Sequence, residues 1–281
     1  MEQVVKQLAL RKHSLDLGKR TLIMGILNVS PDSFSGDGIY EDPAKAVSHA
    51  IRMVEEGASI VDIGGESSRP RSEPVSAKEE LRRVTPVIKG LVECNVPISV
   101  DTYKPEVARE VLELGADMIN DITGLANPEL AQLIAQYKAG VVIMHMKGDP
   151  KTMLENAIYE RGVIEEVKAF LSSRIAMAKD SGIDAERIIV DPGIGFAKKV
   201  NHSLEIIRNL SSLKDLMEPI MIGPSRKGFI GKILDLPVDQ RLEGTLAVAV
   251  ASVINGADIV RVHDVRECSR AIRIADAIFR S

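Results

Sequence analysis

Tryptophan is absent from this chain, and aromatic residues make up only 3% of it. Proteins that bind single-stranded nucleic acid without sequence preference stack bases on aromatic side chains and follow the backbone with a basic groove. This chain offers little of either, because its formal net charge is −4 and its acidic and basic residues are mixed along the sequence. Nucleic acid is therefore not an expected partner.

Cysteine is also scarce, and long apolar runs are missing. Cys94 and Cys268 are far apart and belong to no Cys-x-x-Cys or Cys/His cluster, so a disulfide framework or a zinc site has nothing to build on. No run of about 18 uncharged apolar residues occurs, and residues 1–10 mix charged with apolar residues, unlike a signal peptide. We expect a cytoplasmic enzyme that does not contact a membrane.

Short β-branched apolar runs alternate with longer amphipathic stretches, which is typical of parallel strands covered by helices. The predicted strands are 21–27, 59–63, 97–100, 117–119, 141–144, 187–190, 219–222 and 258–260. Eight strands in 281 residues fit a single α/β domain, residues 1–281, folded as a (β/α)8 barrel or TIM barrel, which typically takes about 250 residues. A doubly wound open sheet shares the alternation, and the sequence favours the barrel without excluding that sheet.

The expected helices lie between these strands. The first begins after Asp42 as N-cap, with Pro43 in its first turn, and ends near Gly57. The others are predicted at 77–93, 105–114, 128–137, 159–181, 201–216, 240–255 and 266–279. Before the first strand, leucines spaced among polar residues predict a short hairpin that closes the barrel bottom; they are Leu8, Leu10, Leu15 and Leu17.

Polar residues terminate every predicted strand. They are Asn28, Asp62, Asp101, Asn120, Asp121, His145, Asp191, Ser225, Arg226, Lys227, Arg261 and His263. The carboxyl ends of parallel barrel strands open on one face, so these residues should meet around one mouth. Any one Asp or Asn could instead cap a helix or turn, but eight polar strand ends together favour a single polar site.

Two long loops follow Asn28 and Asp62, and cations gather at the predicted mouth. The cations are Arg69, Arg71, Arg226, Lys227, Arg261 and His263, which suit an anionic ligand such as a diphosphate. The carboxylates and amide of Asp101, Asn120 and Asp191 suit a flat heterocycle with an amino group beside ring nitrogens. Asn28 offers a hard oxygen for Mg²⁺, although it could also cap a turn.

With these residues in place, the chain resembles the dihydropteroate synthase family from Asn28 to His263. NVSPDSFS at 28–35 and DIGGESSRP at 62–70 are similar to the two mobile catalytic loops of that family. The resemblance continues, in order, through SVDT at 99–102, INDI at 119–122, MHM at 144–146, DPGIGF at 191–196, SRK at 225–227 and RVHDV at 261–265.

The resemblance implies an enzyme that joins 4-aminobenzoate to (7,8-dihydropterin-6-yl)methyl diphosphate with Mg²⁺, giving dihydropteroate and pyrophosphate in folate synthesis. Ionisation of the pterin diphosphate would precede attack by the amine. The implied pterin-binding residues are Asp101, Asn120, Met144, Asp191, Lys227 and Arg261. The implied diphosphate residues are Asn28, Arg69, Arg261 and His263, with Asn28 on the metal. Those for 4-aminobenzoate are Ser68, Arg69, Pro70, Phe196 and Lys227. The implied catalytic residues are Asp101, Lys227, Arg261 and Asp37.

The chain departs from the family pattern at several positions. Asp37 is displaced by one residue, because the family more often has Asp followed by two glycines. Ser68 stands where threonine is usual, Arg71 replaces a small residue, and Gly228 replaces serine or arginine. The response to sulfonamides therefore does not follow from the sequence.

Two other functions share parts of this pattern. Methyltetrahydrofolate methyltransferases that serve corrinoid proteins share the pterin-binding barrel but lack the Ser-Arg-Pro loop and the cations for a leaving group. A pterin-binding module without activity would not need Asn28, Ser68 or Arg69, all of which are present. The apolar stretch 246–254 and the habit of the family indicate a homodimer formed through the late helices.

Overall fold

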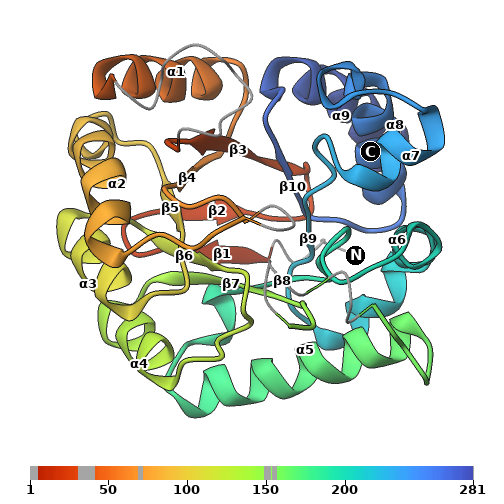
Figure 1. Cartoon of the computed structure of the whole chain (residues 1–281), viewed down its shortest axis with the longest axis horizontal. Coiled ribbons are helices and arrows are strands. Elements are labelled where there is room, and N and C mark those ends of the chain that lie inside the picture. Colours follow the sequence, from red (N-terminus) through yellow and green to blue (C-terminus); the bar gives the residue numbers. More distant parts are fainter. Residues whose placement is uncertain (1–5, 31–41, 69–71, 149–152, 154–156, 281) are drawn as a thin grey trace.

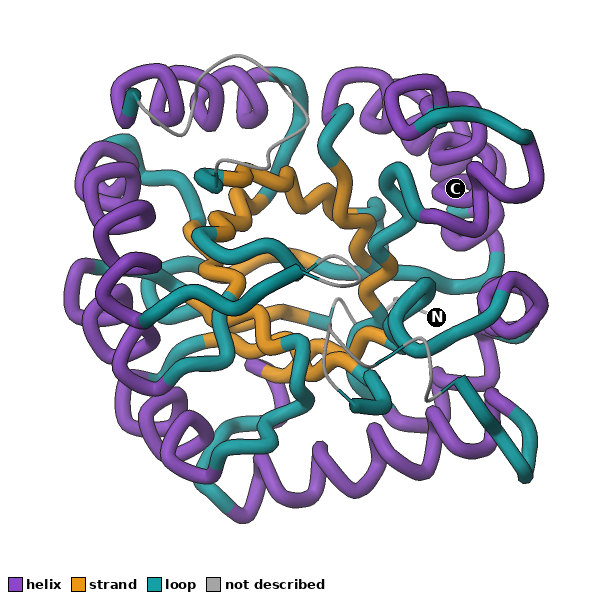
Figure 2. The backbone as a smooth tube through the Cα atoms, viewed as in Figure 1, coloured by secondary structure: helices purple, strands orange, loops and turns teal. Residues whose placement is uncertain are grey.

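Eight parallel strands form a ring with helices around it in the computed structural model (Figures 1 and 2). The structure describes residues 6–30, 42–68, 72–148, 153 and 157–280. The strands of the ring are β3 (Leu22–Asn28), β4 (Ile60–Gly64), β5 (Ile98–Asp101), β6 (Met118–Asp121), β7 (Gly140–Met144), β8 (Ile188–Asp191), β9 (Met221–Ile222) and β10 (Ile259–Val262). Neighbours follow the order β8-β7-β6-β5-β4-β3-β10-β9, and a parallel bridge from Val190 to Ile220 brings the two ends together. The predicted barrel is confirmed.

Alternate residues of each strand face the helices or the barrel interior, because side chains on a strand point to opposite faces. In β10, Val260 and Val262 pack in the helix-covered apolar layer, while Ile259 packs in the interior cluster. Arg261 has the same parity as Ile259, so its side chain also enters the barrel. This alternation is how a buried strand carries a charged residue into the site.

The predicted hairpin is also confirmed. Strands β1 (Gln7–Ala9) and β2 (Ser14–Asp16) pair antiparallel. Leu8 and Leu10 are buried against residues of the barrel interior, among them Met24 and Met118, together with Leu17. The hairpin therefore plugs the bottom of the barrel with leucine side chains, away from the carboxyl ends of the strands.

Leu8→Ala tests this plug. Leu8 is fully buried, so its truncation is expected to lower the free energy of unfolding by about 2–5 kcal/mol through lost burial and the cavity left behind. Urea denaturation followed by circular dichroism measures the loss. Leu15, which is only partly buried beside the same cluster, is the matched control, and Leu15→Ala should cost clearly less. Equal losses would contradict the role given to Leu8.

The helices have the expected order and, in most cases, the expected bounds. They are α1 (Pro43–Glu55), α2 (Ala77–Val92), α3 (Pro105–Leu114), α4 (Pro128–Tyr137), α5 (Val163–Asp180), α6 (Val200–Arg208), α7 (Gly228–Leu234), α8 (Leu242–Ile254) and α9 (Val265–Phe279). Asp42 caps α1 as predicted, because its carboxylate accepts from the backbone N–H groups of Ala44 and Lys45 at 3.0 and 3.2 Å.

Three expectations need correction. Most strands extend one or more residues further than predicted, so Asn28, Asp101 and Asp191 lie in the strands rather than after them. The helix predicted at 201–216 changes at Asn209 into a 3₁₀ helix, Leu210–Leu216. Helix α7 was not predicted, because seven residues with two glycines carry little helical signal.

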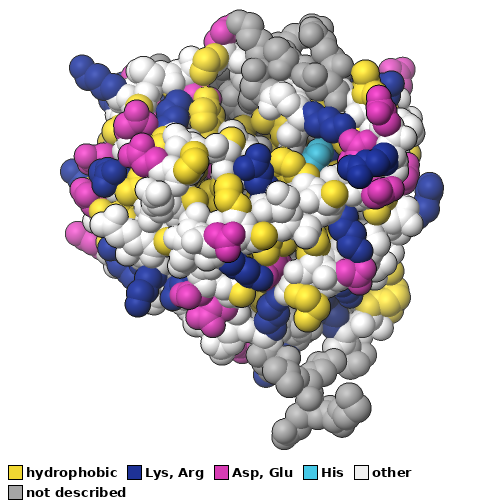
Figure 3. Space-filling view, turned by 90° about the horizontal axis from the view of Figure 1, so that it is seen from below, with side chains coloured by type: hydrophobic (Ala, Val, Ile, Leu, Met, Phe, Trp, Pro, Cys, Tyr) yellow, Lys and Arg dark blue, Asp and Glu magenta, His cyan; other side chains and the backbone are white. Residues whose placement is uncertain are grey.

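Lysine and arginine side chains alternate with aspartate and glutamate over the face drawn in Figure 3, and neither sign dominates among the coloured residues. Such a surface lacks the continuous basic stripe that holds a phosphate backbone. None of the helices in the described part of the chain combines the length and apolar character needed to span a bilayer.

Candidate active site

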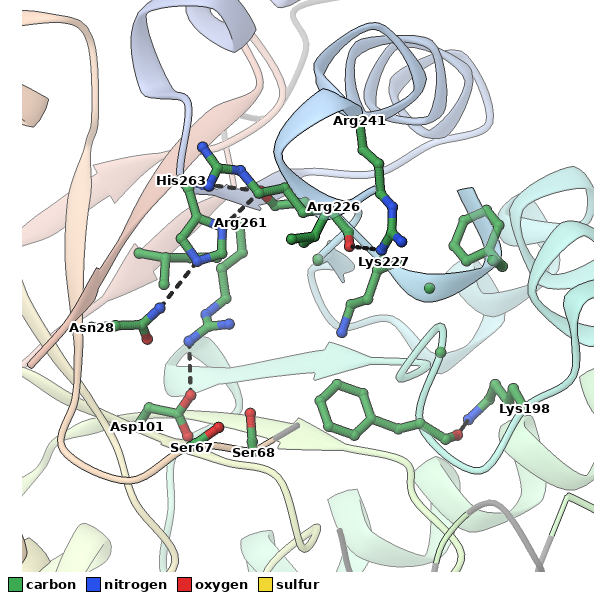
Figure 4. A pocket seen from close by; sticks show the side chains of 18 of the residues that line it. Asn28, Ser67, Ser68, Asp101, Lys198, Arg226, Lys227, Arg241, Arg261 and His263 are labelled. Carbon is green, nitrogen blue, oxygen red and sulfur yellow. Dashed lines mark hydrogen bonds and ion pairs between the residues drawn. The ribbon is translucent and has the colours of Figure 1, made fainter. Parts of the chain in front are cut away.

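A cavity of about 500 Å³ lies where the carboxyl ends of the strands converge. Its wall includes nine of the polar and aromatic residues selected from the sequence, namely Asn28, Ser68, Asp101, Phe196, Ser225, Arg226, Lys227, Arg261 and His263. In Figure 4, Asn28 and Asp101 lie at the left of the cavity, Ser68 lies below it, and Lys227 points into it from above. The barrel thus brings together residues that are up to 235 positions apart in the sequence.

Three residues predicted to contact the heterocycle do not line this cavity. Asn120, Met144 and Asp191 are buried, with exposed fractions of 3%, 3% and 5%. Met144 packs in an apolar cluster with Met153 and the partly buried Phe196. These three side chains lie behind the residues that line the cavity, and their contact with a pterin stays a prediction.

Asp62 is at the centre of the polar groups inside the barrel, although no sequence motif assigns it a role beyond its place at a strand end. Its side chain is fully buried and accepts from Ser99 Oγ at 2.5 Å and from Asn120 Nδ2 at 3.0 Å. Arg261 Nε donates to the same carboxylate at 2.6 Å. Because the amide nitrogen of Asn120 is engaged by Asp62, its carbonyl oxygen remains available as an acceptor.

Arg261 bridges two carboxylates. In addition to its bond to Asp62, its Nη2 donates to Asp101 Oδ2 at 2.7 Å. Burial raises the pKa of Asp101 to about 7, and the charge of Arg261 opposes that rise. Burial also raises the pKa of Asp191, opposed by a 2.7 Å hydrogen bond from the backbone N–H of Gly193. These carboxylates are held in a setting where a nearby positive charge is favoured.

Asp101→Asn is expected to remove a pH dependence of stability between about pH 5 and 7, whatever it costs through the lost ion pair with Arg261. The pKa of Asp101 is about 7 in the folded protein, above its value in the unfolded chain, so the folded state binds this proton more tightly. The resulting contribution to the free energy of unfolding is fully present below about pH 4 and is lost as the pH rises through about 7. Thermal unfolding from pH 5 to 8.5 should give a midpoint difference between variant and wild type that grows in favour of the variant. A difference that is independent of pH would contradict the raised pKa.

Lys227 is held by the turn that follows β8. Its Nζ lies 4.0 Å from the centroid of the Phe196 ring, a cation–π contact. Its methylene stem lies against Gly195, where a Cβ would come within 3.2 Å of Lys227 Cδ. Burial lowers the pKa of Lys227 to about 8, and the negative charge of Asp191 opposes that shift.

Arg226 does not join the cations of the cavity as a free charge. Its φ is +55°, and its guanidinium donates to both carboxylate oxygens of Asp264, at 3.2 and 2.7 Å. Its backbone N–H donates to Thr245 Oγ1 at 3.0 Å. Arg226 therefore fixes the turn that carries Lys227 into helix α7.

Gly228, the first residue of α7, lines the cavity, and a Cβ there would meet no atom within 4 Å, so the missing side chain leaves open space.

Asn28 and His263 form a second polar pair at the cavity. Asn28 Nδ2 donates to His263 Nε2 at 3.1 Å, and His263 Nδ1 lies 2.8 Å from Ser225 Oγ. With its nitrogen engaged in this way, Asn28 keeps its carbonyl oxygen as a hard ligand. Within the described ranges, no group of three or more His, Cys, Asp or Glu side chains could hold a metal ion.

Two strand-end residues have structural roles instead. His145 is buried beside Lys198, and burial lowers its pKa to about 2. Asp121 accepts from the backbone N–H groups of Thr123 and Leu125, both at 2.7 Å, and so fixes a turn. The alternative that a strand-end Asp caps a turn is therefore confirmed for Asp121.

Lys198 is a cavity residue that the sequence did not single out. Its Nζ lies 2.9 Å from His145 Nδ1 and donates to the Phe196 carbonyl at 3.0 Å (Figure 4). Its position two residues after the DPGIGF motif was the available signal. The predicted residues Asp37, Arg69 and Pro70, and Arg71 beside them, lie outside the described residues.

Comparison with known proteins gives a consistent result. Residues 24–263 match the model of a family described as pterin binding enzyme. A dihydropteroate synthase of Synechocystis is 47% identical over 268 residues, which cover 94% of this chain and 92% of that protein. The structure resembles the dihydropteroate synthase of Yersinia pestis, solved with a sulfonamide drug (TM-score 0.92, 40% identity, 97% of this chain and 98% of that one). It also resembles that of Thermus thermophilus, solved with 4-aminobenzoate (TM-score 0.88, 40% identity, 97% and 100%). The chain belongs to the dihydropteroate synthase family of pterin-binding enzymes.

Proposed function

We propose that this transferase condenses (7,8-dihydropterin-6-yl)methyl diphosphate with 4-aminobenzoate, releasing pyrophosphate and forming 7,8-dihydropteroate. Relatives at 43–47% identity over 94% of the chain carry the reaction type. The observation that supports it most directly is the position of Arg261, between Asp62 and Asp101 and in the same cavity wall as Asn28 and His263. Carboxylates for a cationic heterocycle and donors for an anionic leaving group thus share one cavity.

The pterin would lie on the carboxylate side of the cavity. Asp101 and Lys227 line the wall there, and Asp62 orients Asn120 and Arg261 from beneath. Asn120 and Asp191, which are almost fully buried, would meet the ring edge from beneath.

The diphosphate would lie beside Asn28 and His263, with Arg261 between the two halves of the substrate. The Nε and Nη2 groups of Arg261 are engaged by carboxylates, so Nη1 is its donor for the anion. Arg69, which the family pattern adds to this set, remains a prediction. Asn28 is the residue that would hold Mg²⁺, because its amide orientation leaves a carbonyl oxygen for a hard cation. When bound, Mg²⁺ would neutralise part of the charge that develops on the leaving diphosphate.

Bond breaking would come first. The bond from the methylene carbon to the diphosphate oxygen breaks with its electron pair leaving on the diphosphate, and the buried carboxylates of Asp62 and Asp101 stabilise the positive charge left on the pterin. The amine of 4-aminobenzoate, placed by Ser68 and Phe196, then forms the new carbon–nitrogen bond and loses a proton. Enclosure of the cavity limits competing attack by water.

Pyrophosphate release tests the proposal. The dihydropterin diphosphate and Mg²⁺ should release pyrophosphate in the presence of 4-aminobenzoate, with dihydropteroate formed in equal amount by chromatography. Tight pterin binding without product would contradict a synthase and indicate a binding module. Methyl transfer from methyltetrahydrofolate to a corrinoid protein would indicate the methyltransferase instead.

We further propose a cytoplasmic, single-domain homodimer. Apolar side chains are exposed on the late helices, among them Ile254 on α8 and Ile274, Ile278 and Phe279 on α9. Such exposure is typical of an interaction surface. The unpaired, exposed thiol of Cys94 suits a reducing compartment. Light scattering after size exclusion should give about twice the chain mass of 30.6 kDa, and a monomer would contradict the dimer.

A further inference from the structure

The segment between β4 and α2 is tied at both flanks to one carboxylate, that of Glu66. We propose that Glu66 is a positioning residue for the arylamine substrate, because it holds Ser67 and Ser68 at the cavity wall through contacts to Val75, Tyr103 and Lys104. This inference rests on the proposed function for the identity of the substrate. It concerns the described flanks, residues 66–68 and 72–75.

Three donors converge on the Glu66 carboxylate. Oε2 accepts from the backbone N–H of Val75 at 2.8 Å, which joins the start of the segment to its end nine residues later. Oε1 accepts from Tyr103 Oη at 2.8 Å, and Lys104 Nζ lies 2.5 Å from Oε2. Tyr103 and Lys104 lie between β5 and α3, so the carboxylate also ties the segment to the neighbouring βα unit.

The cluster is largely shielded from water. The side chains of Glu66 and Lys104 are 10% and 14% exposed, and Lys104 also forms an ion pair with the buried Glu80 of α2. Ion pairs shielded in this way depend on the presence of every member, since removal of one leaves an uncompensated charge. A second cross-link, from Ser72 Oγ to the Ser67 carbonyl at 2.6 Å, lies within the same segment.

The clamped flank forms part of the cavity. Glu66, Ser67 and Ser68 all line its wall, and Ser67 and Ser68 lie beside Asp101 in Figure 4. The contacts of Glu66 go to Val75, Tyr103 and Lys104 and not to Asp101, Lys227, Arg261 or Asn120. Asp101 lies at the end of β5 and is held separately by Arg261 Nη2 at 2.7 Å, so loss of the clamp should displace the Ser67–Ser68 wall while the pterin residues keep their contacts. A change in the Michaelis constant for 4-aminobenzoate, with pterin affinity preserved, is the signature of this role.

Glu66→Gln is the informative variant, because an amide offers one acceptor oxygen where three donors converge. We expect the KM for 4-aminobenzoate to rise about 10-fold, the equivalent of one charge-assisted hydrogen bond. The dissociation constant of a pterin ligand, measured by calorimetry without 4-aminobenzoate, should stay within about twofold. Tyr103→Phe removes one of the three donors and should shift KM in the same direction by less. Glu129→Gln, which alters an exposed ion pair with Arg109 far from the cavity, is the matched control and should leave both values unchanged.

A second measurement does not depend on activity. Hydrogen exchange at the Val75 amide, followed by mass spectrometry of peptides that cover 72–76, should be faster in Glu66→Gln than in the wild type. Unchanged exchange would overturn the clamp even if the protein proved to have another substrate. Equal weakening of both substrates would overturn the positioning role and leave Glu66 as a residue for stability. A wild type that forms no product would instead count against the proposed function, and the exchange result would still decide on the clamp.

Discussion

Lys227→Met is expected to reduce kcat/KM for the pterin substrate about 100-fold, because one charge-assisted hydrogen bond to the ring is lost. The half-buried Lys227 side chain places Nζ 4.0 Å from the centroid of the Phe196 ring and interacts electrostatically with Asp191 and Asp101. Methionine fills a similar volume without a charge, so the packing against Gly195 is kept while the donor is lost. Steady-state pyrophosphate release would measure the loss of kcat/KM, and calorimetry would measure the loss of pterin binding.

Ser68→Ala is the matched comparison for Lys227→Met. Its hydroxyl lies on the other side of the cavity, so the KM for 4-aminobenzoate should rise while pterin binding is retained. The wild type should also lose pterin-dependent activity as the pH rises through about 8, where Lys227 gives up its proton, and Lys227→Met should lack that decline. Wild-type kinetics in both variants would refute these roles.

Asp62→Asn is expected to weaken pterin binding about 100-fold and to lower the free energy of unfolding by about 3 kcal/mol, a typical cost of breaking a buried charge pair. The substitution removes one of the two carboxylates that hold Arg261. It also places an amide, which can donate as well as accept, opposite the Asn120 amide. The Asn120 amide would then no longer be held with its oxygen available to the ligand. Pterin calorimetry and urea denaturation measure the two losses.

Asp121→Asn separates these two effects. Asp121 is equally buried but accepts from the turn at Thr123 and Leu125 rather than from site residues. It should lower stability without changing pterin affinity in the folded protein. If Asp62→Asn behaved in the same way, Asp62 would be a residue of the core and not one that orients the site.

The sequence was sufficient to predict those features of the fold that depend on neighbouring residues in the chain. Asp42 and Pro43 mark the start of α1, and alternating leucines mark the hairpin that begins at β1, because caps and periodicity depend on neighbours in the chain. Residues such as Asn28 and His263 could be grouped because parallel strands deliver their carboxyl ends to one face. Helix α7 was missed because its seven residues are stabilised by packing rather than by their own propensity.

The strand-end residues show which properties can be inferred from the sequence and which cannot. By itself it favoured the barrel over an open sheet and identified the face on which the site lies and the family, since repeated apolar runs and ordered motifs can be recognised along the chain. Only the tertiary structure decided that Asp62 orients Asn120 and Arg261, that His145 belongs to the core, and that Glu66 joins Val75 to Lys104. These roles depend on hydrogen bonds between residues far apart in the sequence and on burial, and both exist only once the barrel has closed.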